Sequence, residues 1–322
     1  MSEGAQRAEV RGRWAAAGGG YWANAVMLWA GRWAPWAAEG LVWVVAMWFL
    51  LVARARRGSM KYLEVVRGRR GFFRRWWETY RHFAEFGYLL LDRALMLARA
   101  GHGYQMECSG LEHLARADRE AGDGGIVLLS AHFGNAEIGA PYMRQMGYGR
   151  AVHIVMYQTA DGTERFHTKH REMLAEMPII STTDPVAAAA KIMGALKKGG
   201  VVAMRADRTL AGKGVAAEFF GKRVLLPAGP FVTAVASGLP VLDFYTCRLG
   251  KRRYACRFSE ARRYGEAEPG TREERIARAA QDYATHLEKL LNEFPFQWSN
   301  FYDYWHEQAP PPPAARSPAE PS

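Results

Sequence analysis

Short apolar runs between turn residues constrain the fold of this chain more strongly than any other feature of its sequence. Residues 126–129 read Ile-Val-Leu-Leu directly after Gly124 and Gly125. So short a continuous run is typical of a strand buried on both faces of a parallel sheet. Further strands are predicted over 152–157, 178–180, 201–204, 218–220, 224–226, 241–246 and 252–258, the last two as a hairpin.

Predicted helices alternate with these strands. Asp184 and Pro185 supply an N-cap and a first-turn proline, and the helix that they open ends at Gly199 after two lysines. Residues 271–293 carry apolar side chains at three- and four-residue steps, the pattern of a helix that packs on a core by one face. Helices are also predicted from near Asn135 and over 229–237, and a polar turn over 118–125. The alternation predicts an α/β fold with a mixed, mainly parallel central sheet flanked by helices.

The N-terminal third is apolar, aromatic and basic. From Trp33 to Ala53 the only formal charge is Glu39, and a cluster of arginines follows. Many of the eleven tryptophans lie in this part, and the net charge of the chain is +11. Tryptophan prefers the membrane–water interface, and basic residues are attracted to anionic headgroups. We therefore predict a membrane-anchoring segment, spanning or monotopic, held on the cytoplasmic side by its arginines. A buried helix of a soluble core is the alternative.

Residues 74–100 predict a long amphipathic helix with a basic face. This helix either packs on the core with its basic face in water or lies on anionic lipid, and the sequence leaves both open. The predicted organisation is a basic, aromatic segment over 1–32, membrane-anchoring and amphipathic helices over 33–100, an α/β domain over 101–305 and a disordered Pro/Ala-rich tail over 306–322.

His132 and Glu137 are the candidates for proton-transfer chemistry. His132 follows the strand at 126–129, and Glu137 falls in the first turn of the next helix. An imidazole can take a proton from a hydroxyl at neutral pH when a carboxylate holds its other ring nitrogen, and the helix N-terminus favours that carboxylate as an anion. Helix capping and an ordinary loop histidine explain the same spacing, so the pair by itself leaves both readings open.

Several other functional classes lack their motifs. The chain has no Gly-x-Ser-x-Gly elbow, P-loop, zinc finger or RNA-binding signature, so we expect no nucleic-acid partner. Three cysteines at unrelated spacings fit neither a disulfide framework nor a metal site and indicate a reducing compartment. His167 and His170 have the spacing of a metal-ligand pair, but without a metalloprotease motif they are more typical of surface histidines. We expect no metal.

An ordered series of segments resembles one known family. His132-x4-Glu137 after an apolar strand resembles the first motif block of the lysophospholipid acyltransferase superfamily. The segments 204–208, 217–222, 226–230, 238–241 and 295–305 resemble, in order, the later blocks of its lipid A late acyltransferase branch, which contains lauroyl and myristoyl acyltransferases. The resemblance covers roughly residues 33–305. It implies a glycerolipid acyltransferase-like fold with an N-terminal membrane-associated helical segment.

The resemblance also implies roles for individual residues. His132 would be the general base and Glu137 would orient it. Asp207 and Arg208 match the second block, where they would support the acceptor site. Arg205 or Arg208 would bind a phosphate, although Arg205 suits a structural ion pair nearly as well. The remaining candidates would shape the substrate cleft, with the Gly229 N–H near the developing oxyanion or only beginning a helix: Phe220, Gly221, Lys222, Pro227 and Gly229.

The implied activity is transfer of a fatty acyl group from a thioester, on acyl carrier protein or coenzyme A, to a hydroxyl or amine of a lipid acceptor. It needs no cofactor beyond that co-substrate. The expected location is the cytoplasmic face of the bacterial inner membrane, with membrane lipids and an acyl carrier protein as candidate partners. Lipid A enzymes are expected to have glutamine where Arg208 stands, so lipid A is one of several acceptors. A lipid-binding scaffold of the same fold and a thioester hydrolase are the alternatives.

Overall fold

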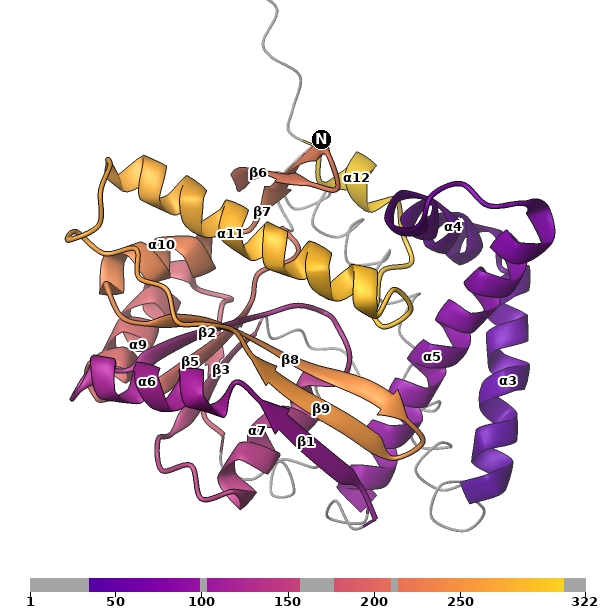
Figure 1. Cartoon of the computed structure of the whole chain (residues 1–322), viewed down its shortest axis with the longest axis horizontal. Coiled ribbons are helices and arrows are strands. Elements are labelled where there is room, and N and C mark those ends of the chain that lie inside the picture. The colour runs from indigo at the N-terminus through magenta and orange to yellow at the C-terminus, as the bar shows by residue number, and fades with distance from the viewer. Residues whose placement is uncertain (1–34, 99–102, 157–176, 210–213, 310–322) are drawn as a thin grey trace, which may run out of the picture.

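A seven-stranded sheet forms the centre of the computed structural model, which describes residues 35–98, 103–156, 177–209 and 214–309 (Figure 1). The strand order is β1-β9-β8-β2-β5-β3-β4, and every neighbouring pair is parallel except β8 and β9. The bounds are β1 Gln105–Ser109, β2 Ile126–Ser130, β3 Val152–Met156, β4 Ile179–Ser181, β5 Val201–Arg205, β8 Val241–Gly250 and β9 Arg253–Phe258. The predicted mixed, mainly parallel sheet is confirmed.

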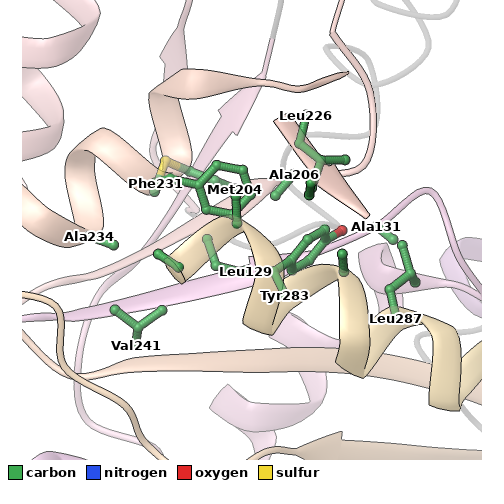
Figure 2. Packing of buried hydrophobic residues seen from close by; sticks show 14 of the residues in the cluster. Leu129, Ala131, Met204, Ala206, Leu226, Phe231, Ala234, Val241, Tyr283 and Leu287 are labelled. Carbon is green, nitrogen blue, oxygen red and sulfur yellow. The ribbon is translucent and has the colours of Figure 1, made fainter. Parts of the chain in front are cut away.

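Helices cover both faces of this sheet. On one side lie α9 (Pro185–Lys197), α10 (Ala228–Ser237) and α11 (Arg272–Glu293), and on the other lie α6 (Leu111–Ala121) and α7 (Ala136–Gln145) (Figure 1). Alternate residues of β2 enter two different cores, because successive strand side chains point to opposite faces. Figure 2 shows Tyr283 and Leu287 of α11 packed with Leu129 and Met204 in the first of these cores. This two-sided burial is the physical reason for the short continuous apolar runs.

The predicted elements are confirmed with small changes at their ends. Asp184 caps α9 through the N–H groups of Val186 and Ala187, and Thr271 begins α11 with a capping box. A second, antiparallel sheet consists of β6 (Val215–Phe219) and β7 (Lys222–Leu226). The strand β1 and the helix α6 were not predicted, and the polar turn over 118–125 is wrong in its first half. Asp118 is helical, and its carboxylate accepts hydrogen bonds from Arg150 and Tyr148.

In the described part of the chain, three helices precede the sheet: α3 (Pro35–Leu51), α4 (Ala53–Arg67) and α5 (Phe72–Ala98). Helices α3 and α5 lie side by side (Figure 1), and Val42 packs directly against Gly87 where the two backbones approach. The long amphipathic helix predicted over 74–100 is confirmed as far as Ala98, and 99–100 lie outside the described residues. Its buried side packs against α3 and Phe301.

Among the described helices, none is by itself long and apolar enough to cross a membrane. The pair 38–51 and 54–67 meets the length and composition of a span only when taken together, across a bend of 93°. The segment 1–32 lies outside the described residues. At the other end, α12 (Tyr304–Glu307) is helical and Gln308 is buried, within the range predicted as tail, and 310–322 lies outside the described residues.

Candidate active site

His132 and Asp207 come from the carboxyl ends of two neighbouring parallel strands. Ser130 of β2 is paired with Arg205 of β5, and the Ala206 N–H donates to the Ser130 carbonyl at 2.9 Å. Each candidate side chain stands two residues beyond that pair. Parallel strands deliver such residues to the same edge of the sheet, which is where ligands bind in open α/β domains. The register of β2 and β5 therefore brings His132 and Asp207 together.

The two side chains form a hydrogen-bonded dyad. His132 Nδ1 lies 2.8 Å from Asp207 Oδ1. The second carboxylate oxygen, Oδ2, accepts the indole N–H of Trp298 at 2.9 Å and lies 3.3 Å from Arg208 Nε. Asp207 is fully buried, whereas the side chain of His132 keeps 35% of its surface exposed. The aspartate is thus a buried, fully partnered anchor, and the imidazole is the member that faces outward.

The protonation states of the dyad follow from its surroundings. Burial lowers the pKa of His132 to about 4, with Asp207 opposing the shift and the positive charges of Arg208 and Arg205 adding to it. Burial alone would raise the pKa of Asp207, but His132, Arg208 and Trp298 outweigh it and hold that pKa well below its usual range. At neutral pH the pair is a neutral imidazole on a carboxylate. Because a carboxylate only accepts, Nδ1 carries the hydrogen and Nε2 keeps its lone pair.

This arrangement predicts an unusual pH dependence. A general base works in its unprotonated form, and a lowered pKa keeps His132 unprotonated at more acidic pH. We expect kcat/KM for acyl transfer to be flat from about pH 8 down to about pH 6 and to fall only as the pH approaches about 4. The measurement is a pH–rate profile of the wild-type chain, with folding at each pH monitored by circular dichroism. A fall centred near 6.5 in a folded protein would contradict the prediction.

The closing segment of the chain holds the His132 loop in place. The Ser299 N–H donates to the His132 carbonyl at 2.8 Å, and the Gly134 N–H donates to the Gln297 carbonyl at 2.9 Å. Phe133 and Trp298 form an antiparallel bridge between these contacts. Trp298 therefore fixes both members of the dyad, the loop through its backbone and Asp207 through its indole.

Gly134 allows this loop to approach β8. Its φ of +54° lies in the left-handed region, and a Cβ at this position would lie 1.8 Å from the Thr246 carbonyl oxygen. We expect Gly134→Ala to destabilise the fold by at least about 2 kcal/mol and to displace His132, because strain and a backbone clash coincide. Gly194→Ala is the matched control, since Gly194 has open space around it within α9. Thermal unfolding of both variants tests this, and equal stabilities would show that the loop can shift without cost.

A buried histidine in α5 supports the closing segment from behind. His82 Nε2 lies 2.8 Å from the Trp298 carbonyl oxygen, and His82 Nδ1 lies 2.8 Å from Ser59 Oγ of α4. Burial lowers the pKa of His82 to about 4, so the ring is neutral at pH 7, with Nε2–H donating to the carbonyl and Nδ1 accepting from Ser59. The helices α4 and α5 thus support the dyad through Trp298, and α5 also accepts a hydrogen bond from Asn135 of the His132 loop at the Leu89 carbonyl.

The other predicted site residues divide into two groups. Arg208 is nearly buried; its guanidinium donates to the Ser299 carbonyl and lies over the Tyr302 ring at 5.5 Å. Arg205 is exposed at the end of β5, close enough to lower the pKa of His132. Glu137 is the second residue of α7, and its side chain lies outside the described part of the structure. The orienting role that the resemblance assigns to Glu137 thus stays a prediction, whereas Asp207 is the described partner of Nδ1.

The second group surrounds the β6–β7 hairpin. Phe220 and Gly221 form its turn with positive φ, and the Phe220 N–H donates to Glu288 of α11. Lys222 places its ammonium 5.7 Å from the centre of the Trp305 ring. Pro227 is the N-cap of α10, and Gly229 lies in the first turn of that helix. The described contacts of Phe220 and Lys222 are with α11 and α12, so the place of this group in a substrate cleft stays a prediction.

Trp298 and Tyr304 contact Asp207, and His82 supports Trp298 from behind; none of the three was assigned a role from the sequence. Tyr304 donates its hydroxyl to the Asp207 carbonyl at 2.7 Å. Trp298 and Tyr304 fall in the closing segment 295–305, whose resemblance to the family was the available signal; nothing in the spacing of His82 marks it. Within the described ranges no group of three or more His, Cys, Asp or Glu side chains is arranged to hold a metal ion, and His167 and His170 lie outside those ranges.

Comparison with known proteins gives one result of high coverage. The family model described as bacterial lipid A biosynthesis acyltransferase matches residues 22–307, which is most of the chain and includes the dyad, the hairpin and the closing segment. No curated protein matches the sequence.

Proposed function

The chain belongs to the bacterial lipid A biosynthesis acyltransferase family, and we propose that it transfers a fatty acyl group from a thioester to a lipid hydroxyl with His132 as general base. The observation that carries the assignment of the base is the 2.8 Å contact between His132 Nδ1 and the buried Asp207 carboxylate. That contact leaves Nε2 unprotonated on the more exposed side of the pair.

The proposed reaction needs no enzyme nucleophile. Nε2 of His132 takes the proton of the acceptor hydroxyl as its oxygen attacks the thioester carbonyl. The tetrahedral intermediate then collapses, the carbon–sulfur bond breaks, and the thiolate leaves with the proton that His132 returns. Asp207 holds the ring in the required tautomer and stabilises the imidazolium between the two steps. The Gly229 N–H is the candidate donor to the oxyanion.

Two charged residues complete the proposal. Arg205 is exposed at the carboxyl end of β5, and its charge is felt by His132, so it is our candidate for binding a phosphate of the acceptor or of the acyl carrier. Arg208 is largely occupied with Asp207 and Ser299, which suits a supporting role. Glu137, in the first turn of α7, remains a candidate for orienting a substrate or His132.

The exposed surface of α3 supports attachment to a membrane. We define the apolar face as Trp43, Val44, Met47, Trp48 and Leu51, which are 42%, 66%, 48%, 66% and 64% exposed. Apolar surface of this extent on one helix favours burial in lipid. We propose that this face anchors the enzyme to the cytoplasmic side of the inner membrane. Flotation with vesicles tests the attachment, and a chain that stays with the soluble fraction would argue against it.

The experiment that tests the function is acyl transfer by the purified chain in detergent, with radiolabelled acyl chains on acyl carrier protein and, in parallel, on coenzyme A. Total lipid from a Gram-negative bacterium serves as acceptor. Label that appears in a glycolipid supports the proposal and identifies both donor and acceptor. Release of free fatty acid at the same rate with and without acceptor lipid would instead identify a thioester hydrolase. If neither acylated lipid nor free fatty acid forms, the chain would instead be a lipid-binding scaffold.

A further inference from the structure

The turn between α4 and α5 contains a basic hollow that the proposed reaction does not use. Its lining comes from α4, the turn itself and the first two turns of α5, and its charged members are Glu64, Arg69, Arg70, Arg75 and Glu78. In Figure 1 this turn lies at the upper right edge of the molecule, beside the end of α3. His132 lies at the sheet edge, so the hollow is a separate feature.

Positive charge dominates the hollow even after its carboxylates are counted. Glu78 is buried and is held at 3.2 Å by both Arg67 Nε and Arg74 Nε. Glu64 lies 3.7 Å from Arg69 Nε. The lining thus holds Arg69, Arg70 and Arg75 against Glu64 and Glu78, and the charge of Glu78 is already compensated by Arg67 and Arg74. The excess of cations favours an anionic ligand.

Arg75 adds a polar atom that lacks a partner. Its Nε is buried, and within the described residues it has no hydrogen-bond partner. A buried donor without an acceptor is costly, and a ligand oxygen would remove that cost. The 27-residue helix α5 begins at the same turn, so the positive end of its dipole lies beside the hollow.

Exposed aromatic side chains lie directly beside this hollow. Phe72 and Phe73 follow the turn with 68% and 86% of their surface exposed, and Trp77 is 54% exposed. Trp77 and Trp43 both contact the ring of Tyr80, at 5.7 and 5.4 Å between ring centres, which joins these aromatics to the apolar face of α3. Two largely exposed phenylalanines would gain little from contact with an acidic carrier protein. In a lipid surface their rings would be buried among apolar chains.

We propose that Arg69, Arg70 and Arg75 form a site for the phosphate of an anionic phospholipid headgroup, with Phe72 and Phe73 inserted among the adjacent acyl chains. We call these three arginines the α4–α5 anion site. The inference rests on the membrane attachment in the proposed function and deepens it. The anion site would make membrane attachment depend on headgroup charge. The apolar face of α3 alone would bind bilayers of any headgroup charge.

The test is flotation of the full-length chain with two kinds of vesicle, phosphatidylcholine alone and phosphatidylcholine with phosphatidylglycerol. The triple variant Arg69→Gln, Arg70→Gln, Arg75→Gln is expected to lose about 100-fold of its partitioning onto phosphatidylglycerol vesicles, from roughly fivefold per arginine, and little on phosphatidylcholine. The variant Phe72→Ser, Phe73→Ser is expected to weaken binding to both kinds of vesicle equally. Inorganic phosphate at millimolar concentration, without vesicles, forms a third arm. Thermal stabilisation by phosphate that the triple variant loses, together with unchanged flotation of that variant, would identify a site for free phosphate and overturn the lipid assignment.

The matched control removes three exposed arginines at the opposite end of the molecule: Arg116→Gln, Arg119→Gln, Arg272→Gln. Figure 1 places α6 at the left, far from α4. If both triple variants lose the same partitioning onto phosphatidylglycerol vesicles, the effect depends only on net charge, and the proposed site is wrong. Acyl transfer in neutral detergent separates the two proposals, since the anion-site variant should keep wild-type activity there. A raised KM for acyl carrier protein with unchanged flotation would assign the arginines to carrier docking instead.

Discussion

Replacing His132 with alanine is expected to reduce acyl transfer by about 10²- to 10⁴-fold, the usual contribution of a general base. The acceptor hydroxyl would then have to lose its proton to water, while the rest of the site stays in place. Asp207 keeps Trp298 and Arg208 as partners in the variant, so its charge remains compensated. The measurement is kcat/KM for transfer from the labelled acyl thioester to lipid, with thermal unfolding measured in parallel.

His82→Gln is the control for a second buried histidine, because His82 supports Trp298 without reaching the site. It should lower stability more than it lowers the rate of a folded sample. The base assignment fails if His132→Ala transfers label undiminished while its unfolding temperature matches the wild type. Loss of vesicle binding in that variant would point to misfolding rather than to lost chemistry.

Asp207→Asn is expected to reduce acyl transfer by a similar factor of about 10²–10⁴, because it puts the wrong tautomer on His132. The carboxylate accepts two N–H groups, from His132 Nδ1 through one oxygen and from Trp298 Nε1 through the other. An asparagine has one oxygen and one NH₂ group. If the oxygen faces Trp298, the NH₂ faces Nδ1, which must then accept, and the proton moves to Nε2. The ring can no longer act as a base.

Glu137→Gln decides between the two acidic residues. If Asp207 is the orienting group, Glu137→Gln should alter KM or the rate by less than about tenfold. A loss in Glu137→Gln as large as that in Asp207→Asn would return the orienting role to Glu137, as the family resemblance implies. Both variants remove one charge without changing volume, so the comparison is balanced. Asp207→Ala is less informative, since it leaves buried donors unpaired and costs about 3–5 kcal/mol of stability.

Much of the fold was predictable because it depends on local patterns. Apolar runs such as 126–129 predict buried strands, since a parallel strand covered on both faces has no polar side to show. Asp184 and Thr271 predict helix starts, because their side chains satisfy N–H groups within the same few residues. The helix α6 was not predicted, although Leu114, Ala117 and Ala121 recur at three- and four-residue steps and pack on one core.

For the candidate site, the sequence by itself determined where His132 lies, because a residue just beyond a buried parallel strand stands at the sheet edge where ligands bind. The ordered motif blocks determined the family. Which carboxylate meets His132 was decided only by tertiary structure. Asp207 is 75 residues away along the chain and reaches Nδ1 because β2 and β5 pair with Ser130 opposite Arg205. Trp298 and His82 join them through the packing of the closing segment on α5. Strand register and side-chain packing are long-range properties, and no local spacing in the sequence encodes them.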